Sequence, residues 1–108
     1  MKYLTSNEAE ILLAVFDLEK EAYGVAIKKY ISRYIDRNVS FGTLYSYLDQ
    51  LFRKGLISKS LGAPTPERGG RSKIYYRLTK DGFDALASVC ERQKLIWSRF
   101  SKASFHKA

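Results

Sequence analysis

The 108-residue chain is poor in the residues on which many catalytic and metal sites depend. It has one cysteine, Cys90, which excludes an internal disulfide and any zinc site built from several cysteines. Its one histidine, His106, lies close to the C-terminal end, so we expect no Ser/His/Asp or Cys/His catalytic set. The glycine pair Gly69-Gly70 lacks the G-K-[ST] signature of a phosphate-binding loop. These absences speak against an enzyme, and we predict no metal ion and no cofactor.

Long hydrophobic runs are also missing. No segment approaches the roughly 20 apolar residues that cross a bilayer, and the N-terminus does not resemble a signal peptide. Instead, the first residues lead almost directly into an amphipathic pattern. We therefore expect a cytoplasmic protein with no membrane partner. The length is that of one compact domain with its own hydrophobic core.

Acidic residues are scarce overall, and the charge is unevenly distributed. The net charge is +8, yet residues 1–27 hold two lysines and five acids, a net of −3. Residues 52–77 hold seven lysines and arginines against one glutamate, a net of +6. A basic patch within one element is the electrostatic footprint of a polyanion-binding protein. A merely solvated face has the same charge, so charge alone leaves both interpretations open.

Hydrophobic spacing and capping signals predict four helices, at about 6–18, 23–35, 40–54 and 79–101, and two strands, at about 56–61 and 73–78. Thr5 and Glu8 form a capping box, and Gly55 ends the third helix. Residues 102–108 are expected to be frayed. The expected inward-facing residues are Ala26, Ile27, Tyr30, Ile31 and Tyr34 in the second helix, Leu44, Leu48, Leu51 and Phe52 in the third, and Ile74, Tyr76 and Leu78 in the second strand.

The predicted fold class is mainly α with a small β-hairpin. In this arrangement residues 1–78 form a winged helix-turn-helix DNA-binding domain. Residues 79–108 form a C-terminal dimerisation helix and tail, and the whole is one compact unit. The hairpin and its Pro/Gly-rich loop, residues 56–78, are called the wing below.

The third helix has an uncharged, hydrogen-bonding side, which we call the polar face. It consists of Thr43, Ser46, Tyr47 and Gln50, at positions i, i+3, i+4 and i+7, and Lys54 continues it. The major groove of DNA admits one helix, and such side chains can contact base edges there. Ser40 is expected to cap this helix, and the free N–H groups beside it can bind a phosphate. The alternative is an idle polar surface.

Cations beside the polar face predict contacts with the DNA backbone. Arg68, Arg71 and Lys73 lie on or next to the wing loop and would neutralise phosphates, with an arginine in the minor groove as an option. Lys28 on the second helix is a further phosphate candidate. A loop with incidental charge is the alternative. The same fold could also serve as a module for protein–protein or RNA interaction, where tyrosines stack on bases.

The C-terminal helix carries more apolar residues than a small body can cover. This apolar stripe consists of Phe83, Leu86, Val89, Cys90, Ile96, Trp97 and Phe100. A large exposed apolar surface marks an interface, so we predict a homodimer. Two recognition helices would then lie about 34 Å apart, which favours a palindromic operator. Cys90 would be buried there as a small hydrophobe, with a redox sensor as the alternative.

With these motifs in view, residues 4–100 resemble the PadR family of winged-helix transcriptional regulators. The resemblance is carried by Tyr23-Gly24, by the V-S-F-G-T-L-Y run at 39–45, and by residues 69–82, which are similar to the family's G-R-x-R-x-Y-Y-x-L-T-x-x-G. It implies a dimeric DNA-binding regulator, usually a repressor, of the short subclass with one C-terminal helix. It also implies a possible planar aromatic effector between subunits, where Trp97 could line the pocket. Residues 19–22 and the long wing loop depart from the family pattern.

Overall fold

The computed structural model describes residues 4–62 and 73–106 of the chain, with side chains as far as residue 102. The elements, in chain order, are α1 (Ser6–Leu18), the 3-10 turn η1 (Glu19–Glu21), α2 (Gly24–Tyr30), the π-helical turn η2 (Ile31–Ile35), α3 (Phe41–Arg53), β1 (Ile57–Leu61), β2 (Ile74–Leu78) and α4 (Lys80–His106). The prediction of a mainly helical fold with one small hairpin and a long C-terminal helix is confirmed.

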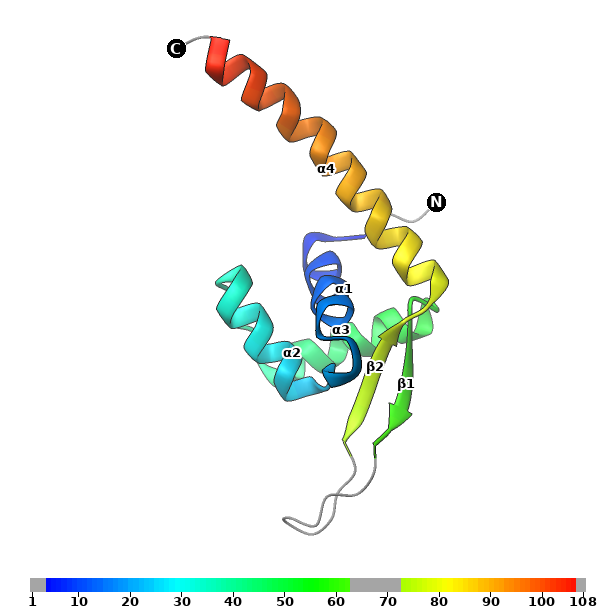
Figure 1. The fold of residues 1–108 in the computed structure, drawn as a ribbon. Helices are drawn as coiled ribbons and strands as arrows, with labels where there is room; N and C mark the ends of the chain where they lie inside the picture. Colours follow the sequence, from blue (N-terminus) through cyan, green and yellow to red (C-terminus); the bar gives the residue numbers. More distant parts are fainter. Residues whose placement is uncertain (1–3, 63–72, 107–108) are drawn as a thin grey trace.

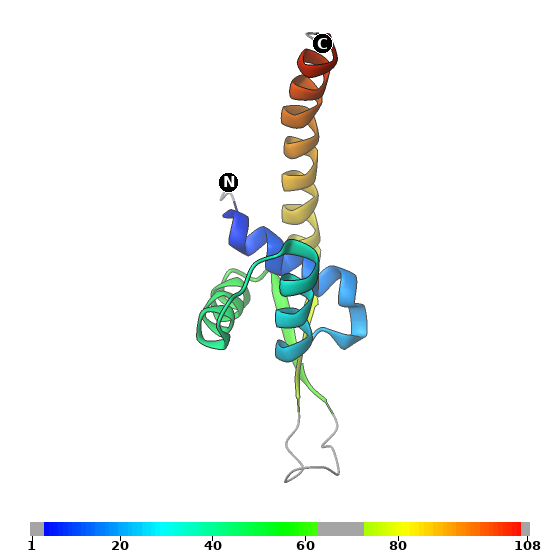
Figure 2. The ribbon, with the colours of Figure 1, turned by 90° about the vertical axis from the view of Figure 1, so that its left-hand side faces the viewer.

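Three helices and the hairpin enclose one hydrophobic core. In Figures 1 and 2, α1, α2 and α3 form a body with the hairpin along one side, and α4 projects away from it. The largest fully buried apolar side chains come from four elements of this body: Leu12 and Val15 from α1, Ile27 from α2, Leu44, Leu48 and Leu51 from α3, and Ile57 from β1. Within the described residues, no helix combines the length and the hydrophobicity that a bilayer span requires.

The first helix begins where the capping box predicts. The Thr5 hydroxyl accepts from the Glu8 backbone N–H at 3.2 Å, and the Glu8 carboxylate accepts from the Thr5 N–H at 3.0 Å. Two otherwise unpaired backbone donors are thereby satisfied. Ile11 and Val15, one turn apart, are then buried on the side that faces the core.

The second helix spans the predicted residues but changes geometry part of the way along. After Tyr30 the backbone widens into the π-helical turn η2, which ends at Asp36 with a φ of 58°. This widening moves the following side chains around the helix axis. Tyr34, expected in the buried stripe, is instead 67% exposed and lies against Tyr30 at a ring-centroid distance of 4.8 Å, while Ile35 packs against the core. The prediction for Tyr34 was wrong.

The third helix has the predicted cap and the predicted buried leucines. The Ser40 hydroxyl accepts from the Thr43 N–H at 3.2 Å, and Gly55, just beyond the helix, has a φ of 77°. Phe52 was expected to face inward, but it is 43% exposed, and the Lys59 ammonium lies 4.3 Å from its ring centroid. Phe52 lies about 100° around the helix from Leu51, past the edge of the buried stripe.

The hairpin is antiparallel, with Ile57 paired to Leu78 and Leu61 paired to Ile74. Tyr76 is buried, and a backbone hydrogen bond links it to the helical body: its N–H donates to the Ala22 carbonyl at 2.8 Å. Ile74 was expected to be buried, but it is 42% exposed, since it lies at the far end of the ladder. Only the part of the hairpin nearest the helices therefore contributes to the core.

The last helix is longer than predicted. It continues to His106, so residues 102–106, expected to be frayed, are helical. At its start, the Thr79 hydroxyl accepts from the Gly82 N–H at 3.0 Å and donates to the Gly55 carbonyl at 2.7 Å. The predicted cap is confirmed, and it also ties α4 to the end of α3.

Candidate nucleic-acid interface

The polar face of α3 is present on the folded protein. Thr43, Ser46 and Gln50 are exposed side by side on the helix, and Tyr47 is half-buried between them and α1. Burial of Leu44, Leu48 and Leu51 on the other side fixes this orientation of the helix. Three uncharged hydrogen-bonding side chains are thus held outward on a rigid element, as contact with base edges requires.

Lys54, the last residue of the predicted polar face, has a different role. Its ammonium lies 2.5 Å from the Glu8 carboxylate, which is almost fully buried at the start of α1. Burial alone would raise the pKa of Glu8, but the hydrogen bonds from Lys54 and Thr5 and the Lys54 charge lower it below its ordinary value. Lys54 therefore joins α3 to α1 instead of extending the polar face.

Lys28 is brought to the beginning of α3. Its ammonium lies 3.4 Å from the Asn38 side-chain oxygen and 5.4 Å from the centroid of the Phe41 ring. The Ser40 hydroxyl also donates to the Thr43 hydroxyl oxygen at 3.0 Å, so two hydroxyl groups and the first-turn N–H groups lie together. A cation beside a helix N-terminus is a favourable arrangement for a phosphate.

Of the three predicted wing cations, the structure describes only Lys73. Lys73 is exposed just before β2, at the loop end of the hairpin, with its ammonium 4.2 Å from the centroid of the Tyr23 ring. Tyr23 in turn packs edge-on against Tyr75, at 5.6 Å between ring centroids. Arg68 and Arg71 lie outside the described residues, and their predicted contacts stay predictions.

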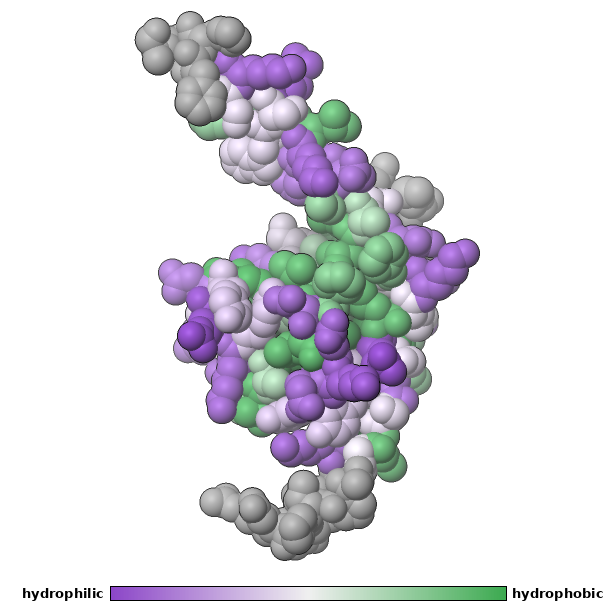
Figure 3. All heavy atoms as spheres, viewed as in Figure 1, coloured by the Kyte–Doolittle hydropathy of each residue, from purple (hydrophilic) through white to green (hydrophobic). Residues whose placement is uncertain are grey.

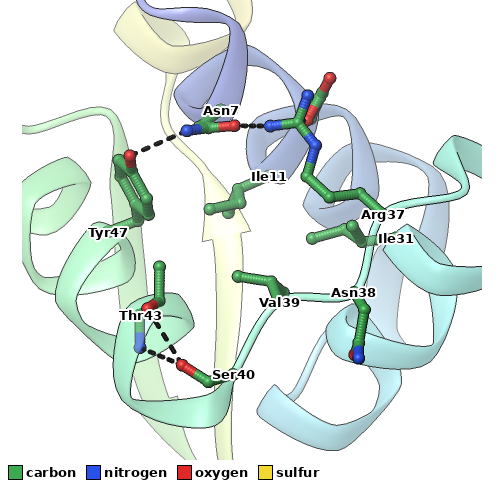
Figure 4. A pocket seen from close by; sticks show the side chains of 10 residues that line it. Asn7, Ile11, Ile31, Arg37, Asn38, Val39, Ser40, Thr43 and Tyr47 are labelled. Carbon is green, nitrogen blue, oxygen red and sulfur yellow. Dashed lines mark hydrogen bonds and ion pairs between the residues drawn. The ribbon is translucent and has the colours of Figure 1, made fainter.

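Sequence reasoning missed a polar network that borders the polar face. The Asn7 side-chain N–H donates to the Tyr47 hydroxyl at 2.9 Å, and Arg37 donates to the Asn7 side-chain oxygen. Arg37 also lies 3.3 Å from the Glu10 carboxylate. Figure 4 shows these side chains around a cavity of about 420 Å³ that Ser40 and Thr43 also line. No local pattern identifies this network, because its members are far apart in the sequence.

Two of the motifs that carried the family resemblance contact one another in the fold. Gly24 lies directly against the Tyr45 hydroxyl, and a Cβ atom at position 24 would overlap it. Gly24 comes from the Tyr-Gly pair that opens α2, and Tyr45 ends the motif in the first turns of α3. The absence of a side chain at Gly24 therefore allows α3 to approach the start of α2 closely.

The apolar stripe is largely uncovered on the single chain. Phe83, Ile96, Trp97 and Phe100 are 52–61% exposed, whereas Leu86 packs partly against the core. Cys90, expected to be buried, is exposed on the single chain.

The exposed apolar surface also includes part of α1, which sequence reasoning missed. An apolar groove of about 420 Å³ between the two helices is lined by Ala9, Glu10, Leu13, Phe16, Phe83, Leu86, Ala87, Val89 and Cys90. Figure 3 shows apolar side chains gathered over this part of the molecule. The spacing of Ala9, Leu13 and Phe16, at i, i+4 and i+7, is a second apolar stripe that could have indicated it.

Several solved structures similar to this chain are described as transcriptional regulators. A regulator from Clostridium thermocellum is 26% identical, with a TM-score of 0.69 over 88% of this chain and 89% of that one. The complex structure of hsRosR-S4 is 30% identical, with a TM-score of 0.63 over 97% and 93% of the two chains. A PadR-like transcriptional regulator from Bacillus cereus has a TM-score of 0.74 over 90% and 89%, and at 22% identity it supports the fold alone.

Comparison with curated proteins finds no match. The family model of the transcriptional regulator PadR-like family matches residues 12–88, which include α2, α3, the wing and the start of α4. This match covers well over half of the chain and agrees with the fold described above. The chain therefore belongs to the PadR-like family of transcriptional regulators, and its winged helix-turn-helix is the fold of a DNA-binding regulator.

Proposed function

We propose that the protein is a cytoplasmic, homodimeric repressor that binds a palindromic operator through α3 and the wing. The observation that carries this proposal is the exposed polar face of α3. Thr43, Ser46 and Gln50 project from one side of a helix whose N-terminus lies beside Lys28. Base-edge contacts from the helix and phosphate contacts from its N-terminus and the wing then act on the same duplex.

The uncovered apolar stripe supports the homodimer. Exposed aromatic side chains on a projecting helix are costly in water, and a C2 partner would cover the same surface on both copies. Such a partner also duplicates α3, so that one operator contains two half-sites related by symmetry. Occupation of a promoter by this dimer would exclude other proteins, which is the simplest route to repression.

Selection of bound duplexes from a random pool tests the proposal directly. A palindromic consensus with half-sites about one DNA turn apart is expected. A protein that prefers heparin or single strands to every duplex would contradict the assignment and favour an RNA- or protein-binding module.

The selected operator then allows two variants to be compared. Gln50→Ala should relax base preference at one position in each half-site, at a cost of about 1–3 kcal/mol. Arg71→Ala should weaken binding to all duplexes alike and reduce the salt dependence. If Gln50→Ala weakens operator and random duplexes equally, α3 does not read bases.

We further propose that a planar aromatic effector releases the operator by binding near the C-terminal helices. Trp97 is the only tryptophan in the chain, and its indole N–H donates to the Gln93 side-chain oxygen at 2.9 Å. Stacking of an aromatic ligand should therefore quench a single fluorescence signal. Titration with planar aromatic dyes, followed by operator binding in their presence, tests this. Quenching without any change in operator affinity would remove the effector role.

A further inference from the structure

A chain of polar contacts joins three elements beside the polar face. Arg37, in the turn before α3, pairs with Glu10 of α1 at 3.3 Å and donates to the Asn7 side-chain oxygen. Asn7 donates to the Tyr47 hydroxyl at 2.9 Å. Figure 4 shows Asn7 between Arg37 and Tyr47, with dashed lines to both.

The chemistry of these groups fixes the direction of each hydrogen bond. An arginine guanidinium has donors only, so the Asn7 atom that meets Arg37 must be the oxygen. The amide NH₂ of Asn7 is then the group that faces Tyr47, and an amide NH₂ only donates. The Tyr47 hydroxyl oxygen must accept this bond, so the hydroxyl proton points elsewhere.

This hydroxyl proton has no acceptor among the residues that the structure describes, since Asn7 is the only hydrogen-bonding partner of the Tyr47 hydroxyl there. Tyr47 is half-buried and lines the cavity that Ser40 and Thr43 also line. It belongs to the polar face, one turn from Thr43 and one turn from Gln50. Because Tyr47 belongs to the polar face, its hydroxyl proton can meet an acceptor on DNA when α3 lies against a duplex.

We propose that Arg37 and Asn7 are positioning residues that make the Tyr47 hydroxyl a hydrogen-bond donor to an acceptor atom of the operator. This inference rests on the proposed function, because it requires α3 to lie against DNA. Acceptors of this kind are base-edge nitrogen and oxygen atoms in the groove and the oxygens of the backbone phosphates. The direction of the bond would exclude a base-edge donor, such as a cytosine or adenine amino group, from this place.

Asn7→Asp tests the direction of the bond with little change of shape. A carboxylate accepts only, so it would keep Arg37 on one oxygen and receive the Tyr47 proton on the other. The Tyr47 hydroxyl would then present only lone pairs outward. The new charge lies in the first turn of α1, where the helix dipole tolerates an acid, so the variant should fold and melt like the wild type. A merely structural contact would therefore be preserved.

The matched control for charge is Asn38→Asp. Asn38 lines the same cavity and already accepts from Lys28, but it does not touch Tyr47. Both substitutions add one negative charge beside α3, which weakens every duplex by repulsion. Because the carboxylate introduced at position 38 would also pair with Lys28, Asn38→Asp gives an upper limit to the loss that the added charge alone causes. The loss of operator affinity in Asn7→Asp should exceed that in Asn38→Asp by roughly threefold to tenfold, the usual worth of one hydrogen bond.

Tyr47→Phe should lower operator affinity by a similar factor. In the Tyr47→Phe background, the further loss of operator affinity caused by Asn7→Asp should be no larger than the loss caused by Asn38→Asp in the wild type. Binding of each variant to the operator and to a random duplex separates the two sources of acceptor. A loss confined to the operator, with relaxed preference at one position, identifies a base edge. An equal loss on both duplexes identifies a phosphate.

The inference is overturned if Asn7→Asp matches Asn38→Asp on both duplexes, or if Tyr47→Phe binds like the wild type. In either case Gln50→Ala shows whether the proposed function survives. A changed base preference in Gln50→Ala means that α3 reads DNA and that only the Tyr47 assignment is wrong. Absence of any duplex preference in the wild type removes the proposed function itself.

Discussion

Glu8 is the only charged side chain that is buried among the described residues, and two partners, Thr5 and Lys54, make this possible. Its carboxylate accepts from the Thr5 N–H, pairs with Lys54 at 2.5 Å, and caps the first turn of α1. A buried carboxylate without such partners would be very unfavourable. This one residue therefore joins the beginning of α1 to the end of α3, and it helps to hold α3 in place.

The lowered pKa of Glu8 makes part of the stability dependent on pH. Because the folded pKa is below the ordinary value of 4.5, the folded protein binds fewer protons than the unfolded chain in acid. The contribution of Glu8 is complete above about pH 4.5 and is lost as the pH falls through the folded pKa. Urea unfolding at several pH values should show Glu8→Gln about 1–3 kcal/mol less stable at pH 7, with the difference disappearing in acid.

An exposed ion pair on α3 provides the control. Asp49 and Arg53 are 2.9 Å apart with both side chains largely in solvent. Asp49→Asn should change the free energy of unfolding by less than about 0.5 kcal/mol. A loss in Asp49→Asn equal to that in Glu8→Gln would show that burial of Glu8 is not the cause.

At the scale of elements, the start of α4 depends on a close approach between backbones. Gly82 lies against the Leu56 carbonyl, and a Cβ atom at this position would overlap that backbone oxygen. The Thr79 N–H donates to the same carbonyl at 3.1 Å, and the Thr79 hydroxyl donates to the Gly55 carbonyl. The Thr79 and Gly82 positions, separated by two residues, are thus the points where α4 meets the turn after α3.

Gly82→Ala should therefore be severely destabilising, by roughly 3 kcal/mol or more, because backbone must move to admit the methyl group. Gly42→Ala is the matched control, since a Cβ atom there meets nothing within 4 Å. Alanine is the better helix former, so Gly42→Ala should be neutral or stabilising by up to about 1 kcal/mol. Urea or thermal unfolding measures both. Equal stability of the two variants would contradict the close approach.

At the scale of the whole molecule, α4 extends far beyond the body that it leaves (Figure 1), and the molecule measures 61 × 29 × 22 Å. The first turns of α4 pack on α1, where the ring centroids of Phe16 and Phe83 lie 6.1 Å apart. Farther along, Trp97 and Phe100 contact each other at 5.9 Å between ring centroids and remain mostly exposed. The single chain therefore leaves its aromatic anchors in water, which is the physical basis for the proposed dimer.

Trp97→Ala should weaken the proposed dimer by about 2 kcal/mol or more, as expected for an aromatic side chain at the centre of an interface. Leu95→Ala is the matched control, because Leu95 is 69% exposed and lies on roughly the opposite side of the same helix. Sedimentation equilibrium should show monomer in Trp97→Ala at concentrations where wild type and Leu95→Ala are dimers. A wild-type monomer at micromolar concentration would rule out the dimer.

The order and approximate limits of the helices and strands could be predicted from the sequence, because their signals are local. The capping box at Thr5 and Glu8, the cap at Ser40 and the glycine at 55 each act within a few residues. The polar face of α3 was predictable for the same reason, since it needs only the helical period and a correct buried side.

Only the tertiary structure decided what the polar side chains do. Lys54 and Glu8 are 46 positions apart, Asn7 and Tyr47 are 40 apart, and Arg37 and Asn7 are 30 apart. No local period relates such residues, and their contacts arise only once α1 packs across α3. The misplaced aromatic residues have similar causes: the π-helical turn moved Tyr34 outward, and the edge of the core left Phe52 exposed. Local spacing thus determined the elements, whereas packing between them determined which side chains are free to meet DNA.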